Sequence, residues 1–155
     1  MKTVELILND EQAVLALAVD MAPQIKPGLV VYLVGDLGAG KTVFAKGILQ
    51  GFGYEGLVKS PTYSLVESYQ LGDDFICYHF DLYRLSEPEE LEFTGSRDHF
   101  NEESVCLVEW PEKAQGFIPE ADIVCELEYH KSGRKITISA QSNIGEKVML
   151  RCFDD

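Results

Sequence analysis

The sequence predicts a three-layer α/β domain built on a mixed sheet, with parallel strands at its centre and antiparallel hairpins beside them. Three observations support this prediction. A short continuous apolar run at 29–34 is typical of a strand buried on both faces, as in a parallel sheet. Two later pairs of strand-like segments each enclose a turn signal. The length of 155 residues fits one domain and is too short for two, so we expect a single domain over 1–155.

The first third of the chain is predicted to form a helix, a strand and a second helix. Apolar side chains recur at helical spacing from about 10 to 22, and Asn9 or Asp10 is a suitable N-cap residue for that helix. The apolar strand at 29–34 follows after a stretch rich in proline and glycine. A loop then leads into the second helix, which we expect at about 41–52.

The rest of the chain is predicted to be rich in strands. Residues 72–74 join the two strands of the first hairpin. Residues 131–134 join those of the second, whose alternating pattern leaves one face in solvent. Ser86 and Glu89 fit a capping box that opens a short helix. The predicted strands are 62–70, 75–81, 104–109, 123–129 and 135–141.

The composition excludes several classes of function. Thirteen Lys and Arg residues stand against 26 Asp and Glu residues, so the formal net charge is −13. Such a chain does not grip nucleic acid or an anionic membrane through a broad basic surface. No apolar run approaches the roughly 18 residues of a membrane span, so we expect a cytoplasmic protein. The four cysteines form no C-x-x-C motif, which favours reduced thiols over a zinc site.

One motif can bind an anion locally in spite of this charge. Residues 35–42, GDLGAGKT, fit the pattern G-x-x-x-x-G-K-[ST] and lie between the apolar strand and the second helix. The glycines let successive backbone N–H groups point inward, and the helix N-terminus adds its dipole. The domain is therefore predicted to be P-loop NTPase-like. Lys41 is expected to reach the β and γ phosphates, and the Thr42 hydroxyl to bind Mg²⁺. The predicted loop residues are Gly35, Asp36, Leu37, Gly38, Ala39, Gly40, Lys41 and Thr42.

Two acidic residues end predicted strands. Asp81 closes the segment 75–81, and Glu109 closes 104–109. In this architecture the acids near Mg²⁺ and the attacking water stand at the carboxyl ends of strands beside the phosphate loop. A single acid at a strand end is usually only a solvated residue, but two of them in a P-loop protein favour a catalytic site. Their spacing leaves open which acid contacts the metal and which orients water.

Further residues have both a functional and a structural interpretation. Thr62 follows a proline and is either a sensor of the γ-phosphate or part of a simple turn. Trp110, the only tryptophan, is either a core residue or a contact beside the site. Arg84, Arg97 and Arg134 are candidates for balancing phosphate charge, although each alone is an ordinary surface ion-pair residue.

Four motifs together resemble a known family. They are the loop at 35–42, S-P-T-Y-S-L-V at 60–66, H-F-D-L-Y-R at 79–84 and the pair Glu109-Trp110. This set, in this order, resembles the TsaE family (formerly YjeE), bacterial ATPases of tRNA threonylcarbamoyladenosine biosynthesis. The resemblance runs from the first helix to about residue 140 and covers nearly the whole chain.

The resemblance implies a small ATPase that acts with the partner proteins TsaB and TsaD to modify adenosine 37 of tRNA. It implies ATP as substrate, ADP as product and Mg²⁺ as cofactor. Hydrolysis is expected to be weak in the isolated chain and to support turnover of the transferase rather than to supply the transferred group. Given the net charge of −13, we expect the chain not to grip tRNA strongly by itself.

The resemblance also assigns roles to single residues. Lys41 and Thr42 become the phosphate and Mg²⁺ residues of the ATP site, and Glu109 a metal-site acid. Asp81 becomes an acid needed for hydrolysis, Thr62 a switch-like residue, and Trp110 a neighbour of the nucleotide or of a partner. Two additional ATP-site candidates are Asp10, whose segment can approach the base, and Arg134, from the Gly-Arg pair of the late hairpin.

Three alternatives fit the sequence less well. A GTPase should carry the motifs N-K-x-D and D-x-x-G, and neither occurs. A small-molecule kinase commonly has an arginine-rich lid, whereas only two arginines lie between residues 43 and 133. A nucleotide sensor without turnover has no need of the acids at the two strand ends.

Overall fold

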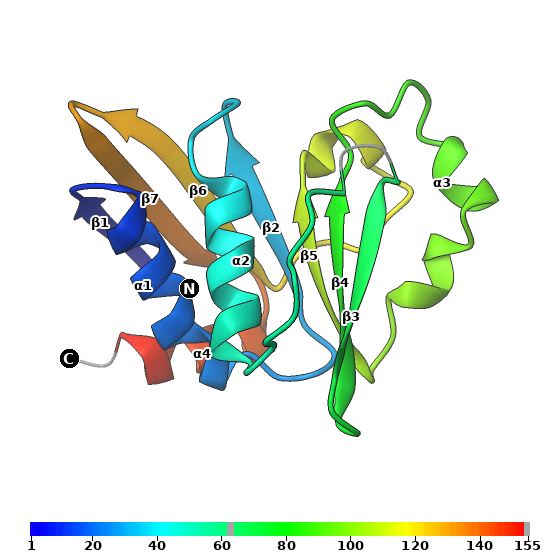
Figure 1. The fold of residues 1–155 in the computed structure, drawn as a ribbon, viewed down its shortest axis with the longest axis horizontal. Helices are drawn as coiled ribbons and strands as arrows, with labels where there is room; N and C mark the ends of the chain where they lie inside the picture. Colours follow the sequence, from blue (N-terminus) through cyan, green and yellow to red (C-terminus); the bar gives the residue numbers. More distant parts are fainter. Residues whose placement is uncertain (62–63, 154–155) are drawn as a thin grey trace.

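The computed structural model describes residues 1–61 and 64–153. Helices and strands follow one another along the chain, with the strand pairs β3–β4 and β6–β7 each consecutive (Figure 1). The strands are β1 (Thr3–Leu8), β2 (Val30–Gly35), β3 (Val66–Leu71), β4 (Phe75–Asp81), β5 (Ser104–Glu109), β6 (Ile123–His130) and β7 (Gly133–Ala140). The α-helices are α1 (Glu11–Met21), α2 (Lys41–Gly51), α3 (Glu90–Phe93) and α4 (Asn143–Cys152). Short 3₁₀ turns are η1 (Ala22–Gln24), η2 (Ser96–His99) and η3 (Pro111–Ala114).

All seven strands form one mixed sheet in the order β1-β7-β6-β2-β5-β4-β3. At its centre β2 runs parallel to both β5 and β6, and β4 runs parallel to β5. The hairpins β3–β4 and β6–β7 are antiparallel, as is the pair β1–β7. The predicted parallel centre with antiparallel additions is confirmed. It brings the carboxyl ends of β2, β4 and β5 to the same edge of the sheet (Figure 1).

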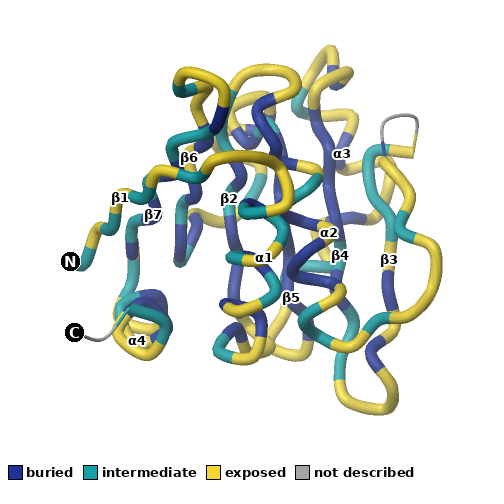
Figure 2. Tube along the Cα trace, turned by 60° about the vertical axis from the view of Figure 1, so that its left-hand side comes forward, coloured by how far each residue is buried: buried dark blue, intermediate teal, exposed yellow. Residues whose placement is uncertain are grey.

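The sheet is covered unequally on its two faces. Helices α1, α2 and α4 bury one face in a large core that includes Leu33, Leu107 and Met149. The other face has a smaller core around Phe80 and Val108, covered by α3, η3 and the segments between them. Buried positions therefore run along the central strands (Figure 2). The result is the predicted three-layer arrangement, with a thin third layer.

Helices α1 and α2 approach each other closely because a glycine lies between them. A Cβ added at Gly47 of α2 would come 2.6 Å from the Cβ of Ala18 and 2.7 Å from the carbonyl oxygen of Leu15, both on α1. This close packing anchors α2, whose first residues are the last two of the phosphate-loop motif. The loop therefore leads into a helix that the core positions firmly.

Several local predictions need correction. Sequence reasoning missed β1 and α4, and the short helix begins at Glu90. The carboxylate of Glu90, not that of Glu89, accepts the backbone N–H groups of Ser86 and Glu87, at 2.8 and 3.0 Å. The helix begins two residues after Pro88, and the carboxylate one residue later than expected is the one that reaches these N–H groups. Within the described residues, no helix combines the length and apolar character needed to cross a membrane.

Candidate active site

The phosphate-loop motif forms a tight turn between the end of β2 and the start of α2. Gly35, Gly38 and Gly40 all have positive φ angles, of +148°, +78° and +110°. A Cβ at Gly35 would collide with the carbonyl oxygen of Leu127 on β6. Glycine is required there by both the backbone conformation and the close approach of β6.

Side chains of the β6–β7 hairpin donate hydrogen bonds to the backbone of this loop. The Tyr129 hydroxyl donates to the carbonyl oxygen of Leu37 at 2.9 Å. The Arg134 guanidinium donates to the carbonyl oxygens of Ala39 and Gly38, at 3.2 and 3.4 Å, and packs over the Tyr129 ring. Arg134 thus contacts the loop backbone in this structure. Its predicted contact with ATP stays a prediction.

Lys41 is folded back over the loop. Its ammonium group donates to the carbonyl oxygens of Gly35 and Asp36, and lies 3.8 Å from the centroid of the Trp110 ring. Burial lowers the pKa of Lys41, while the nearby carboxylates of Glu109 and Asp81 oppose that shift. The ammonium is therefore held by carbonyl dipoles and an aromatic face, contacts that a phosphate group can replace.

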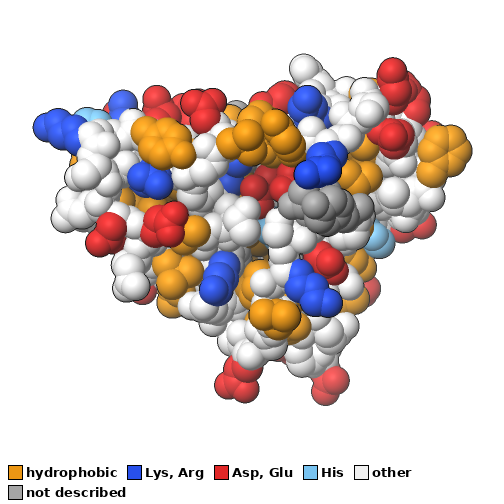
Figure 3. All heavy atoms as spheres, turned by 45° about the horizontal axis from the view of Figure 1, so that its top comes forward, with side chains coloured by type: hydrophobic (Ala, Val, Ile, Leu, Met, Phe, Trp, Pro, Cys, Tyr) orange, Lys and Arg blue, Asp and Glu red, His pale blue; other side chains and the backbone are white. Residues whose placement is uncertain are grey.

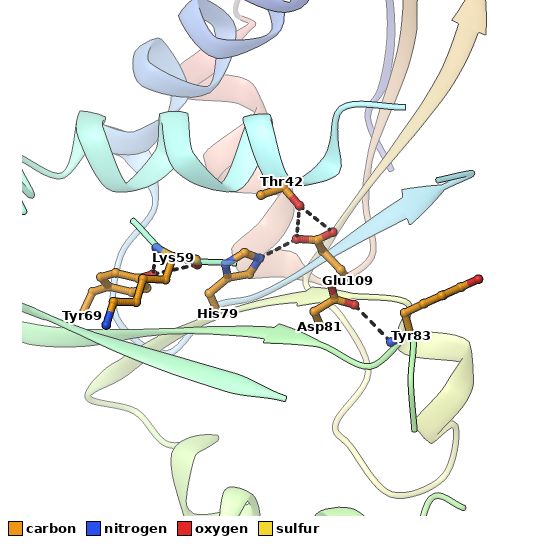
Figure 4. Close-up of polar contacts among 7 residues, drawn as sticks. All are labelled: Thr42, Lys59, Tyr69, His79, Asp81, Tyr83 and Glu109. Atoms are coloured by element: carbon orange, nitrogen blue, oxygen red, sulfur yellow. Dashed lines mark hydrogen bonds and ion pairs between the residues drawn. The ribbon is translucent and has the colours of Figure 1, made fainter. Parts of the chain in front are cut away.

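The two predicted acids lie side by side at the edge of the sheet. Asp81 and Glu109 are paired in the register of β4 and β5, and both are largely buried, with 9% and 2% of their surface exposed. The Thr42 hydroxyl donates to the Glu109 carboxylate, at 3.0 Å from Oε2 and 3.2 Å from Oε1. Figure 4 shows Thr42 at the start of α2, directly facing Glu109. The structure thus joins the end of the loop to one of the two acids.

Asp81 has a different environment from Glu109. Its Oδ1 accepts the backbone N–H of Tyr83 at 3.1 Å (Figure 4). Burial raises the pKa of Asp81, and the negative charge of Glu109 adds to the effect. The N–H of Tyr83 and the nearby His79 and Lys41 oppose it. The chain therefore holds the Asp81 carboxylate in a position that is unfavourable for its charge.

From this environment we expect the negative charge of Asp81 to destabilise the folded protein in the absence of nucleotide. The pKa of Asp81 in the folded protein is raised above its ordinary value of 3.8. The destabilisation is therefore absent below pH 3.8, and it grows as the pH rises from there through the raised pKa. Asp81→Asn removes the charge and keeps an oxygen for the Tyr83 N–H. It should raise the melting temperature by about 2 °C near neutral pH and by less at about pH 4.

Thermal unfolding at the two pH values, followed by circular dichroism, checks this expectation. Asp73→Asn, in the exposed turn between β3 and β4, is the matched control and should show no pH-dependent gain. An equal change for Asp81→Asn at both pH values would contradict the assignment.

A cavity of about 280 Å³ brings the loop, the acids and the tryptophan together. It opens at the edge where β2, β4 and β5 end. In Figure 3 acidic side chains are visible there in a recess flanked by hydrophobic and basic ones. A larger hollow of about 570 Å³ lies between β2, β6 and η3, but no residue of the motif lines it. The lining of the smaller cavity comprises Glu11, Leu37, Gly38, Gly40, Lys41, Thr42, Val43, Ser60, Asp81, Glu109 and Trp110.

Trp110 lies on one wall of this cavity. Its backbone adopts a left-handed conformation with φ of +59°, directly after β5, and its ring is 5.0 Å from that of Tyr83. The side chain therefore contacts both Lys41 and Tyr83 and lies beside the predicted phosphate site. Its position agrees with the interpretation as a contact residue.

Asp10 and Arg97 are not among the residues that line this cavity. Asp10 caps α1 by accepting the N–H of Ala13 at 2.9 Å, while its neighbour Glu11 lines the cavity. Arg97 forms an exposed ion pair with Glu92. Thr62 lies outside the described residues.

The segment that leads to Thr62 is anchored on the sheet. The hydroxyl of Tyr69 on β3 accepts the N–H of Lys59 at 3.0 Å and donates to the carbonyl oxygen of the same residue at 3.1 Å (Figure 4). This clamp holds the chain one residue before Ser60, which lines the cavity.

Sequence reasoning missed one buried residue of the site. The Nε2 atom of His79 lies 2.6 Å from Oε2 of Glu109, and the side chain is fully buried. His79 lies two residues before Asp81 on the same strand. Since side chains alternate along a strand, the two share one face. The two-residue spacing between His79 and Asp81 could have indicated from the sequence that His79 lies near the site.

The site residues lie within a segment that matches a known protein family. A family model described as threonylcarbamoyl adenosine biosynthesis protein TsaE matches residues 8–136. The chain belongs to the TsaE family. The match spans every site residue from Asp10 to Arg134, so the TsaE assignment covers the whole candidate site.

Individual TsaE relatives agree with this assignment. The tRNA threonylcarbamoyladenosine biosynthesis protein TsaE of Haemophilus influenzae is 56% identical over 121 residues, covering 78% of this chain and 76% of the relative. The protein of the same name from Bacillus subtilis is 38% identical over 121 residues, covering 76% and 73%. The crystal structure of Bacillus subtilis YdiB matches this TsaE-family fold with a TM-score of 0.80 at 29% identity, covering 97% of this chain and 94% of that one.

Proposed function

We propose that this chain binds ATP with Mg²⁺, hydrolyses it to ADP and phosphate, and thereby supports formation of threonylcarbamoyladenosine at adenosine 37 of tRNA. The relatives' names support the place in tRNA modification. The observation that carries the hydrolytic step is the contact between Thr42 and Glu109, with Asp81 beside it. This contact supports the proposal, because it groups a hydroxyl and two carboxylates beside the loop that the motif predicts to bind phosphate.

The oxygen donors at this edge fit Mg²⁺. A hydroxyl and carboxylates are hard ligands, and Mg²⁺ in nucleotide sites is commonly held by one or two carboxylates together with the substrate phosphates. In the described part of the chain, no group of three or more His, Cys, Asp and Glu side chains could hold a metal alone. When bound, Mg²⁺ would neutralise charge on the β and γ phosphates.

The geometry favours one assignment of the two acids. Thr42, the motif's metal residue, contacts Glu109, so we assign Glu109 to the metal side of the site. Asp81 has its Oδ1 on the Tyr83 N–H and lines the same cavity. We assign it to the attacking water. Its raised pKa suits a group that accepts a proton during hydrolysis.

Lys41 must move for this reaction. Its ammonium leaves the carbonyl oxygens of the loop when phosphate oxygens take their place, and this motion also changes its contact with Trp110. The backbone N–H groups of the loop and the N-terminus of α2 bind the phosphates, while Lys41 stabilises charge that develops during transfer.

The partner proteins enter this proposal through the family. We propose TsaB and TsaD as partners and expect slow turnover from the chain alone. The net charge of −13 disfavours direct binding of tRNA by this chain, so the partners would supply the tRNA contact. A pull-down of TsaB and TsaD with ATP present tests this part, and failure to retain either protein would contradict it.

Nucleotide binding is tested by the fluorescence of the single tryptophan. Because Lys41 lies on the Trp110 ring, titration with ADP or ATP in the presence of Mg²⁺ should change the emission as the ammonium moves to phosphate. Calorimetry on the same samples measures the affinity, and release of phosphate from ATP measures turnover. If millimolar nucleotide gave neither a fluorescence change nor heat, the proposed function would be wrong.

A further inference from the structure

His79 has no role in the proposed mechanism, yet its surroundings are unusual. It lies on β4 with 0% of its surface exposed. Its Nε2 atom is 2.6 Å from Oε2 of Glu109, and Figure 4 shows the ring directed at that carboxylate beneath the start of α2. The other ring nitrogen, Nδ1, has no hydrogen-bond partner among the described residues.

Packing alone does not account for a histidine at this position. A buried polar atom without a partner destabilises a fold, and an aliphatic side chain would fill the space without one. Cys77, two residues earlier on the same face of β4, is a small apolar residue and is equally buried. What distinguishes His79 from its neighbour is the contact with Glu109.

The contact also favours a proton on Nε2, the ring nitrogen that faces the Glu109 carboxylate. The Glu109 carboxylate already accepts the hydroxyl of Thr42 on Oε1 and Oε2. At 2.6 Å, a bare Nε2 lone pair would face the lone pairs of Oε2 and repel them. The favourable arrangement is a proton on Nε2 that is donated to Oε2, with Nδ1 as the unpaired acceptor.

We infer that His79 is a positioning residue that orients the Glu109 carboxylate toward Thr42. The inference rests on the proposed function, because it gives Glu109 a metal-side role. With His79 on one side and Thr42 on the other, the carboxylate is held by two donors from different elements, β4 and α2. Without the imidazole, the carboxylate is free to rotate away from the position that the cation requires.

The expected effect is therefore on the cation and not on the nucleotide. Removal of a hydrogen bond that orients a metal-binding carboxylate typically lowers metal affinity or activity about 10- to 100-fold. The loop N–H groups and Lys41 do not contact His79, so binding of ADP without Mg²⁺ should persist.

The test measures ADP affinity by calorimetry, with and without Mg²⁺, in the wild-type chain, His79→Leu and His79→Gln. All three should bind ADP alone with affinities within about twofold of one another. Addition of Mg²⁺ should raise the ADP affinity of the wild type, and this Mg²⁺-dependent gain should be about tenfold smaller in His79→Leu. Glutamine can place an N–H near the position of Nε2, so His79→Gln should recover most of that gain. An unchanged gain in His79→Leu, or a His79→Gln variant as impaired as His79→Leu, would overturn the inference.

Cys77→Ala is the matched control, since it alters packing on the same strand and face without touching Glu109. It should lower the melting temperature and leave the Mg²⁺-dependent gain unchanged. A loss of that gain equal to the loss in His79→Leu would show a packing effect and overturn the inference.

A second measurement needs neither nucleotide nor metal. In wild-type chain with ¹⁵N-labelled histidine, the ring of His79 should show a protonated Nε2, protected from exchange, and a bare Nδ1. The signal is assigned by its loss in His79→Gln. The opposite tautomer would overturn the inference. Absence of ADP binding in the wild type would instead count against the proposed function, and the spectrum would still report on the His79–Glu109 contact.

Discussion

Lys41→Ala is expected to reduce ATP hydrolysis by at least about 100-fold, because it removes the positive charge that we propose stabilises the transferred phosphate. The free fold should tolerate the change well. Among the described residues, the Lys41 ammonium contacts carbonyl oxygens of its own loop and the Trp110 ring, and burial already lowers its pKa. The melting temperature should therefore stay within about 2 °C of the wild-type value.

Phosphate release with TsaB and TsaD present measures this effect, and circular dichroism verifies the fold. Lys46→Ala is the matched control, since Lys46 lies on the same helix but is exposed. The control should retain full activity. Turnover of Lys41→Ala within threefold of wild type would refute the role assigned to the loop lysine.

Glu109→Gln is expected to lower turnover by about 100-fold and to leave binding of metal-free ADP within about threefold of wild type. The amide is nearly isosteric and keeps one oxygen for Thr42 and His79, so the site should retain its shape. What it loses is the negative charge on the side that we assign to Mg²⁺. Turnover should recover little when Mg²⁺ is raised.

The comparison variant is Glu112→Gln, an exposed acid in η3 that lines the larger hollow between β2, β6 and η3. It should behave as wild type in steady-state phosphate release. If Glu109→Gln lost ADP binding without Mg²⁺ as well, Glu109 would have a structural role, and the assignment of the two acids would have to be reversed or abandoned.

Much of the fold was predictable because its signals are local. The run at 29–34 predicted β2 to within one residue, and the segment 104–109 matches β5. Turn residues at 72–74 located the first hairpin, and the turn predicted at 131–134 located the second, although Gly133 and Arg134 already belong to β7. Each of these signals is contained in fewer than about ten neighbouring residues.

The elements that were missed depend on distant partners. β1 is an edge strand whose exposed and half-buried positions alternate, and it pairs with β7 at the other end of the chain. Helix α4 contains Gly145, which lowers helix propensity. A Cβ there would strike the carbonyl oxygen of Asp122, so tertiary packing requires the glycine. Propensity and periodicity carry no information about such contacts.

The candidate site likewise has residues that the sequence predicts and contacts that it does not. The motif at 35–42 and the strand-end acids Asp81 and Glu109 are evident in the sequence. The phosphate loop has a fixed spacing, and each acid directly follows an apolar, strand-like run. The sequence by itself thus determined the family, the loop and the identity of the two acids.

Only the tertiary structure shows which of these residues contact one another. Thr42 and Glu109 are 67 residues apart, and His79 and Glu109 are 30 apart, yet they form one chain of hydrogen bonds. Strand order and the parallel register of β4 with β5 bring them together, and neither is encoded in local spacing. The pairing of Glu109 with Thr42, the outer support from Arg134 and the burial of His79 all arise from this long-range packing.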